Sequence, residues 1–352
     1  MQRFVLVVVA LCAAVAVQSA GASQIISTSS VTKLKLGVNG KGEAMLTYTA
    51  KGKVVHVLAW GAVDAIPPTQ GMKQVAFQLA YDGGFKHNYT QSPTVKAMLA
   101  SLRSLQVQLK KAVAAGNTTQ RDALSAKIKA TYAKLAQLRT AATNYWKTFT
   151  CPTYDGPQLA LMVTACKAPD GSYWAVQSWD RDLPDYGVKP TVAQSQIEVH
   201  LAHWTGDLPV LDVHVDWAYG GQWNHLWGSY TYNGVGVHGF AATPAGVPLD
   251  TFGRNLYVDT LDSAYGPGWQ RENSFLMHGP GGTWCYSVNP HTVDGVTHPA
   301  GTGSQYRLTI LGPGVTPDVS VTVDAPGPYD RAAQQPDNQA LLALGDPKCV
   351  PH

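Results

Sequence analysis

The chain has 352 residues, a formal net charge of +3 and 45% hydrophobic but only 14% charged residues, with 34 Gly, 10 Trp and 16 Tyr. This composition excludes a disordered chain and is typical of a rigid extracellular β protein with aromatic surfaces. No Gly-x-Ser-x-Gly, His-Glu-x-x-His or P-loop motif is present, so no common class of hydrolase, zinc peptidase or nucleotide-binding protein is indicated.

A signal peptide is predicted at residues 1–22. Arg3 precedes an unbroken apolar run over residues 4–17, and Ala20 and Ala22 provide the small residues that a signal peptidase requires. The run is shorter than the ~20 residues that span a bilayer. We therefore expect a secreted, extracellular chain that starts near Ser23 and has no membrane span once processed.

Four cysteines remain after removal of the signal peptide, and an even number in an exported chain favours disulfides over free thiols. We expect Cys151 to pair with Cys166, closing a short loop. Cys285 should pair with Cys349 and so pin the Pro- and Gln-rich tail at residues 326–352. No Cys-x-x-Cys pair supports a zinc site.

Residues 23–91 contain alternating polar and apolar runs at 43–49, 53–60 and 74–81, separated by Gly-rich or Pro-rich turns. Alternation with such turns predicts antiparallel strands. These strands form the N-terminal part of a β body.

The pattern changes to helical spacing in residues 92–149. Apolar residues follow alternating steps of three and four, which predicts one apolar seam on each of two helices and therefore an antiparallel helical hairpin. Gly116 and Asn117 indicate the end of the first helix, and Thr119 with Asp122 resembles a capping box. The seam residues are Val95, Met98, Leu102, Leu105, Leu109 and Ala112, then Leu124, Ile128, Thr131, Leu135, Leu138, Ala142 and Tyr145.

This hairpin, called the arm below, carries ten Lys and Arg residues against one acidic residue, whereas residues 150–352 carry 8 basic and 19 acidic residues. Three roles remain open. The arm can dock on the acidic body of its own chain or of a second copy, bind an anionic polymer through counterion release, or simply be solvated. No aromatic residue interleaves with the cations for base stacking before Tyr132 and Tyr145.

Residues 150–325 show further strand patterns with Gly and Pro turns and no intervening helices. They predict a main β-sandwich, and the arm is then an insertion at a sheet edge. The expected fold class is mainly β, an antiparallel β-sandwich or jelly roll with an inserted antiparallel α-helical hairpin. One elaborated domain and two domains are both compatible with the length.

Candidate chemistry concentrates in residues 196–218. Two alternating runs, at 196–204 and 210–218, are separated by a linker short enough for a hairpin. Such a hairpin would place its polar residues on one face, with His200 near His214 and Glu198 near Asp216. These four residues are candidates for acid and base catalysis, and His200, His214 and Asp212 are candidate metal ligands. A solvated face and a ligand cleft without chemistry are the alternatives.

Aromatic residues supply the candidate ligand platform. Trp223 and Trp227 follow the second run in a Gly-rich segment that we predict to be a connection, and Tyr230 comes shortly after them. Trp269 and Arg271 lie in a Gly- and Pro-rich segment that we predict to be a loop. Exposed aromatic faces of this kind stack on sugar rings, and a buried structural role is the alternative for each of them.

We therefore predict a non-catalytic binding protein for carbohydrate or a cell-envelope polymer, with no cofactor. A polysaccharide-acting enzyme that uses the 196–218 face, as a glycosidase or lyase, is the first alternative. A surface-assembly protein that docks through the arm, with possible self-association, is the second. No specific nucleic acid is expected as a partner.

Overall fold

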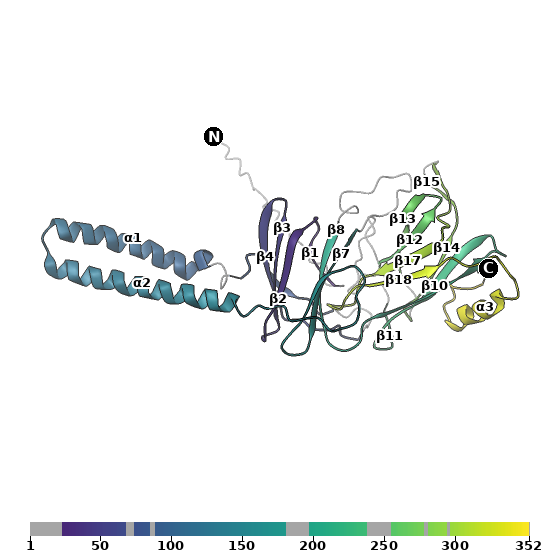
Figure 1. Cartoon of the computed structure of the whole chain (residues 1–352), viewed down its shortest axis with the longest axis horizontal. Coiled ribbons are helices and arrows are strands. Elements are labelled where there is room, and N and C mark those ends of the chain that lie inside the picture. Colours follow the sequence, from purple (N-terminus) through teal and green to yellow (C-terminus); the bar gives the residue numbers. More distant parts are fainter. Residues whose placement is uncertain are drawn as a thin grey trace, which may run out of the picture.

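The computed structural model describes residues 23–67, 74–84, 89–180, 197–237, 255–277, 281–293 and 296–351, so the predicted signal peptide lies outside the described residues. Two antiparallel β-sandwiches lie next to each other, and the helical arm projects from the first of them (Figure 1). The predicted fold class, an antiparallel β-sandwich with an inserted helical hairpin, is confirmed.

The N-terminal sandwich has two four-stranded sheets. The first contains, in order, β2 (Thr32–Val38), β3 (Glu43–Ala50), β4 (Lys53–Trp60) and β5 (Gln78–Ala80). The second contains, in order, β1 (Gln24–Ser27), β8 (Ile197–Trp204), β7 (Tyr173–Asp180) and β6 (Met162–Lys167). Both sheets contribute to one core in which Leu46, Trp174 and Leu201 are fully buried. Strands on either side of the arm in sequence therefore share one core.

The C-terminal sandwich contains the strands that follow residue 209. One sheet is built around β10 (Trp223–Tyr232), which pairs with β9 (Val210–Ala218), β11 (Val235–Gly236) and β14 (Thr283–Val288). The other has, in order, β13 (Gly266–Leu276), β12 (Asn255–Ser263), β17 (Gln305–Ile310) and β18 (Val319–Asp324). A small hairpin is formed by β15 (His291–Val293) and β16 (Val296–His298). Leu226, Leu256 and Leu308 lie in the core between the two larger sheets.

Two segments that we expected to be connections are strands. Residues 223–227 open β10, and residues 266–273 belong to β13. Most β10 residues are buried irrespective of the face on which they lie. A strand covered on both faces shows no polar and apolar alternation, which explains why the sequence pattern did not indicate it.

The arm consists of η1 (Tyr89–Gln91), α1 (Pro93–Ala114) and α2 (Thr118–Trp146). Every predicted seam residue is buried or half-buried, so the predicted hairpin is confirmed. Gly116 ends α1 with a φ of +67°, a conformation that glycine adopts without strain. The N-cap of α2 is Asn117 rather than the expected Thr119. The Asn117 side chain accepts a hydrogen bond from the Gln120 backbone N–H at 3.0 Å.

The end of α2 is fixed to the N-terminal sandwich. The backbone of Thr150 pairs in both directions with Val38 at the end of β2, with N···O distances of 2.6 and 3.0 Å. The Tyr145 hydroxyl donates to Glu43 Oε2 at 2.7 Å, and Trp146 meets the His56 ring edge to face at 5.3 Å. These contacts give the arm a defined attachment to the sheet.

Both predicted disulfides, Cys151 to Cys166 and Cys285 to Cys349, are confirmed. The tail that the second disulfide pins contains a short helix that we did not predict, α3 (Gln334–Ala343). In the part of the chain that the structure describes, no helix is both long and apolar enough to cross a membrane.

Candidate functional site

The predicted hairpin at residues 196–218 does not form. Strand β8 pairs with β7 and β1 in the N-terminal sandwich, whereas β9 pairs with β10 in the C-terminal one. His200 and Glu198 therefore belong to a different sheet from His214, Asp212 and Asp216, and the expected proximity of His200 to His214 and of Glu198 to Asp216 is wrong. The linker at residues 205–209 crosses between the sandwiches instead of reversing the chain. Among the described residues, no group of three or more His, Cys, Asp or Glu side chains could hold a metal ion.

His200 instead lies in a buried polar cluster between the two sandwiches, which we call the junction cluster: Ser23, Glu198, His200 and Asp318. Its Nδ1 is 3.0 Å from Asp318 Oδ2 and 2.9 Å from Ser23 Oγ, and its Nε2 is 3.1 Å from Glu198 Oε2. The Ser23 hydroxyl also donates to Asp318 Oδ1. Asp318 precedes β18 of the C-terminal sandwich, so the cluster joins the two cores.

The junction cluster is an ion pair and not a titrating base at neutral pH. Burial alone would lower the pKa of His200, but the charge and hydrogen bonds of Asp318, together with those of Glu198, outweigh it and raise the pKa to about 9. Burial likewise acts to raise the pKa of Asp318, but the facing imidazolium and the hydrogen bonds from Ser23 and Trp179 hold it below its ordinary value.

The cluster contains a serine, a histidine and two acids, but its geometry does not match nucleophilic catalysis. A catalytic triad needs serine on one imidazole nitrogen and the carboxylate on the other. Here Ser23 and Glu198 do lie on opposite nitrogens of His200, but Asp318 shares Nδ1 with Ser23 and accepts the proton of the Ser23 hydroxyl, so the imidazole does not act as the base for this serine. His200 and Ser23 are both 0% exposed, so substrate has no access to either group. The cluster has the properties of a structural junction.

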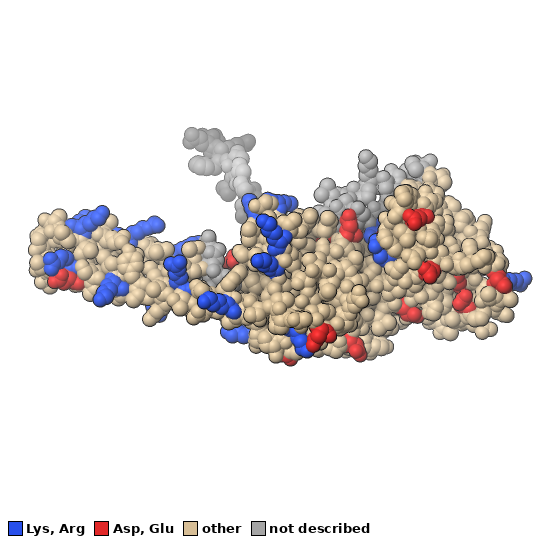
Figure 2. Space-filling model, viewed as in Figure 1, with Lys and Arg blue, Asp and Glu red and all other residues tan. Residues whose placement is uncertain are grey.

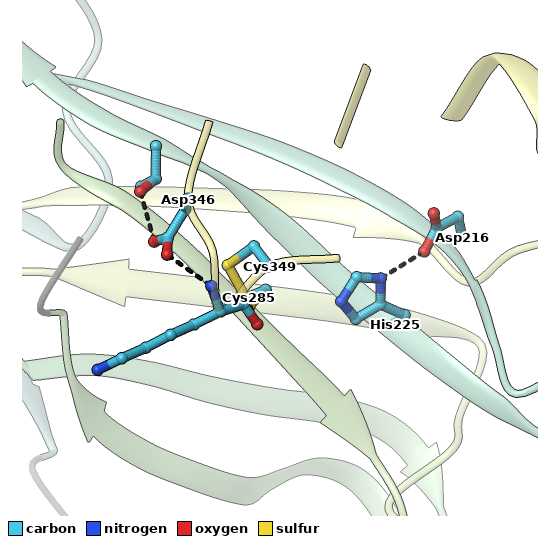
Figure 3. Close-up of a disulfide and its surroundings, with 7 residues drawn as sticks. Asp216, His225, Cys285, Asp346 and Cys349 are labelled. Carbon is cyan, nitrogen blue, oxygen red and sulfur yellow. Dashed lines mark hydrogen bonds and ion pairs between the residues drawn. A yellow bond between two sulfur atoms is a disulfide. The ribbon is translucent and has the colours of Figure 1, made fainter. Parts of the chain in front are cut away.

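The other predicted carboxylate and histidine residues form two separate pairs on β9 and β10. His214 and Asp212 form an exposed pair at 3.0 Å. Asp216 and His225 form a buried pair at 2.8 Å, close to the disulfide between Cys285 and Cys349 (Figure 3). Neither pair forms a combined acid and base site with the junction cluster.

The predicted aromatic platform is largely buried. Trp227 is 1% exposed, because Leu341 of α3 and Cys349 of the tail cover it on one side and the His214 ring stacks on it at 4.1 Å. Tyr230 is fully buried in the core, and its hydroxyl donates to the Leu311 carbonyl at 2.9 Å. Exposure of these two residues was therefore predicted wrongly. Trp223 is half-buried.

Trp269 and Arg271 lie on the face of their sheet that points away from the core. Asp259 is the centre of this group, with Arg271 Nε at 2.5 Å and Arg307 Nη2 at 2.9 Å. The Arg307 guanidinium lies 4.5 Å from the centre of the Trp269 ring. Cations, carboxylate and ring thus satisfy one another, and a ligand-binding role for Trp269 and Arg271 remains a prediction.

Glu272 is a buried acid on the face of β13 opposite to the one that carries Trp269 and Arg271. Its side chain is 0% exposed, and the Tyr286 hydroxyl donates to its Oε1 at 3.4 Å. Burial raises its pKa to about 7, although hydrogen bonds from the Gly301 backbone and Tyr286 act in the opposite direction. Glu272 was not among the predicted site residues, because its burial depends on which face of an unpredicted strand it occupies.

We expect Glu272 to make the protein less stable as the pH rises from about 4.5 to 7. The unfolded chain loses the proton first, and the folded state keeps it until its higher pKa is reached, so folding costs up to about 3 kcal/mol more above pH 7. The Glu272→Gln variant should be more stable than the wild type at pH 8 and similar at pH 4. Urea denaturation of both proteins across this range tests this, and parallel stability curves would contradict it.

The arm is strongly cationic. Its ten Lys and Arg side chains are all exposed. Among described residues only Arg121 has an ion pair, with Asp122 at 2.9 Å, so nine cations have no ionic partner. Figure 2 shows blue side chains along the arm, with the red ones mostly over the body. The arm extends away from the body (Figure 1), so docking of the arm on its own acidic body is not observed.

Comparison with protein-family models, curated proteins and solved structures found no match to this chain.

Proposed function

We propose that this chain is a secreted, non-catalytic binding protein that holds an anionic polymer of the cell envelope or extracellular space on its cationic arm. The observation that carries the proposal is the arm itself, with nine exposed cations that have no ionic partner among the described residues. Cations in this state are surrounded by small counterions in solution. A polyanion that replaces those counterions gains their release entropy, and this favours binding.

The shape and packing of the arm support this role. Its apolar seam is satisfied internally by Val95, Leu102 and Leu135, so the helices do not need a partner in order to fold. The contacts of Tyr145 and Thr150 hold its base to the N-terminal sandwich. A projecting, anchored cationic rod presents its charges along its length to a long polymer, and this mode of binding needs no pocket.

The two predicted alternatives to polymer binding receive different support. A polysaccharide-acting enzyme has less support than polymer binding, because Glu198 and His200 are buried in the junction cluster and lie apart from His214 and Asp216. Assembly remains the second candidate, because the ten cations of the arm complement the 19 acidic residues that follow residue 149. The arm of one copy would then bind the body of the next.

Replacing residues 93–144 with a short Gly linker tests the proposal. The variant should fold, because neither sandwich core contains an arm residue and the two ends of the removed segment lie only about 10 Å apart, the spacing of packed helices. The intact protein should bind polyphosphate and heparin, with affinity falling steeply between about 50 and 200 mM salt. The variant should bind neither.

Neutral dextran of similar length is the control polymer, and circular dichroism with thermal unfolding is the control for folding. Polyphosphate binding that survives removal of the arm would overturn the proposal. A different result would establish the assembly role in its place. The intact protein would sediment as salt-sensitive oligomers, the variant would not, and neither protein would bind either polyanion.

A further inference from the structure

Ser23, the predicted first residue of the mature chain, is buried between the two sandwiches, an unusual place for the start of a chain. The first residues of a domain are generally exposed at the surface, yet Ser23 is 0% exposed. Its hydroxyl bonds to Asp318 and His200, and its backbone nitrogen donates to the Gly312 carbonyl at 3.2 Å. Ser23 also directly follows Ala22, where the sequence predicts removal of the signal peptide.

The Ser23 nitrogen lies beside a backbone carbonyl and a carboxylate, two groups that attract an ammonium ion. The amide has one hydrogen, which the Gly312 carbonyl accepts. Gly312 in turn donates its own N–H to Asp318 Oδ1 at 3.1 Å, so carbonyl and carboxylate lie together next to Ser23. Because the Ser23 hydroxyl touches Asp318, the nitrogen of the same residue lies within about 6 Å of this carboxylate, close enough to stabilise a positive charge.

We propose that cleavage after Ala22 creates an α-ammonium group on Ser23 and that Asp318 binds this group, completing the junction between the two sandwiches. Water hydrolyses the Ala22–Ser23 peptide bond in the signal peptidase. The new carboxylate leaves with the signal peptide, and the new amine stays on Ser23 and takes up a proton. This inference rests on processing at Ala22 and is independent of the proposed function of the arm.

Processing then has a structural consequence. Asp318 belongs to the C-terminal sandwich, and Ser23 immediately precedes β1 of the N-terminal one. An ammonium group adds two donors and one positive charge at a site where an unprocessed chain offers only its single amide hydrogen. The mature protein is therefore more resistant to unfolding than a chain that retains residues ahead of Ser23.

Periodate provides the first test, since it oxidises a 1,2-amino alcohol and therefore attacks serine only when serine is the first residue. The chain should be expressed with its signal peptide and the secreted protein analysed by mass spectrometry. Its mass should correspond to a start at Ser23. Periodate should react with the urea-unfolded protein and leave the native protein intact. A different first residue, or equally fast oxidation of the native protein, would overturn the proposal.

A one-residue extension provides the second test. Two proteins, released from a cleavable tag, begin at Ser23 or at Ala22, and the extension moves the amine by ~3.8 Å, one residue along the chain. The midpoint of thermal unfolding should be lower for the extended protein, by about 2 to 4 °C or more. The same extension should have no effect in an Asp318→Asn background. Equal midpoints, or an effect that persists without the carboxylate, would contradict binding by Asp318, and the periodate test remains decisive if Asp318→Asn does not fold.

Discussion

Replacing Asp318 with Ala is expected to lower the free energy of unfolding by about 3 to 5 kcal/mol, the range for breaking a buried ion pair by removing one partner. Asp318 accepts hydrogen bonds from Ser23, Trp179 and the Gly312 backbone and faces His200 at 3.0 Å. Without the carboxylate, three donors and a buried imidazolium lose this acceptor together. Urea denaturation at pH 7, where His200 is charged, measures the effect.

The exposed pair on β9 is a matched control. His214 and Asp212 have the same chemistry and the same 3.0 Å separation as the junction pair, but their side chains are 43% and 52% exposed. Because water screens such pairs, Asp212→Ala should change stability by at most about 1 kcal/mol. Equal losses for Asp318→Ala and Asp212→Ala would show that the junction cluster does not hold the sandwiches together.

Replacing Cys285 and Cys349 together with Ser should cost about 4 kcal/mol, because this disulfide closes 64 residues of chain and long loops gain the most entropy on release. The tail should also detach from Trp227, which Cys349 and Leu341 cover. Asp346, which bonds to Thr283 at 2.8 Å beside the disulfide (Figure 3), should then no longer be held in place.

The second disulfide serves as the control. Cys151 and Cys166 close only 15 residues, so replacing them should cost about 3 kcal/mol. Hydrogen exchange in peptides that cover α3 should accelerate in the Cys285 and Cys349 variant and remain unchanged in the Cys151 and Cys166 variant. Unchanged exchange in both would show that the tail is held by its own packing and not by the disulfide.

Features that depend on neighbouring residues could be predicted from the sequence. Within each helix the arm seam repeats every three or four residues, and its members are buried or half-buried because helical geometry alone puts them on one side. The disulfides followed from the even number of cysteines and from the need to hold a tail. Strands such as β3, bordered by turns, were recognised by their alternation.

Features that depend on distant residues could not be predicted. Ser23 meets Asp318 across 295 positions, and no local pattern indicates this contact. His200 and His214 looked like partners because their strands are adjacent in sequence, but the chain crosses to another sandwich between them. Trp227 looked exposed because the tail that covers it arrives more than a hundred residues later. The candidate sites were therefore predicted wrongly where tertiary packing decides which side chains are exposed and which lie together.

The slope of log affinity for polyphosphate against log salt concentration tests most directly whether the arm binds anionic polymers. Lys96, Arg103 and Lys110 are spaced by seven residues and share one face of α1. Replacing them with Gln should reduce the slope by up to about 2 to 3, since each lost phosphate contact removes ~0.7 to 0.9. Replacing Lys35, Lys51 and Lys53 of the N-terminal sandwich, an equal change in charge off the arm, should leave the slope unchanged. Equal slopes for all three proteins, or an equal loss in both variants, would contradict a polymer site on the arm.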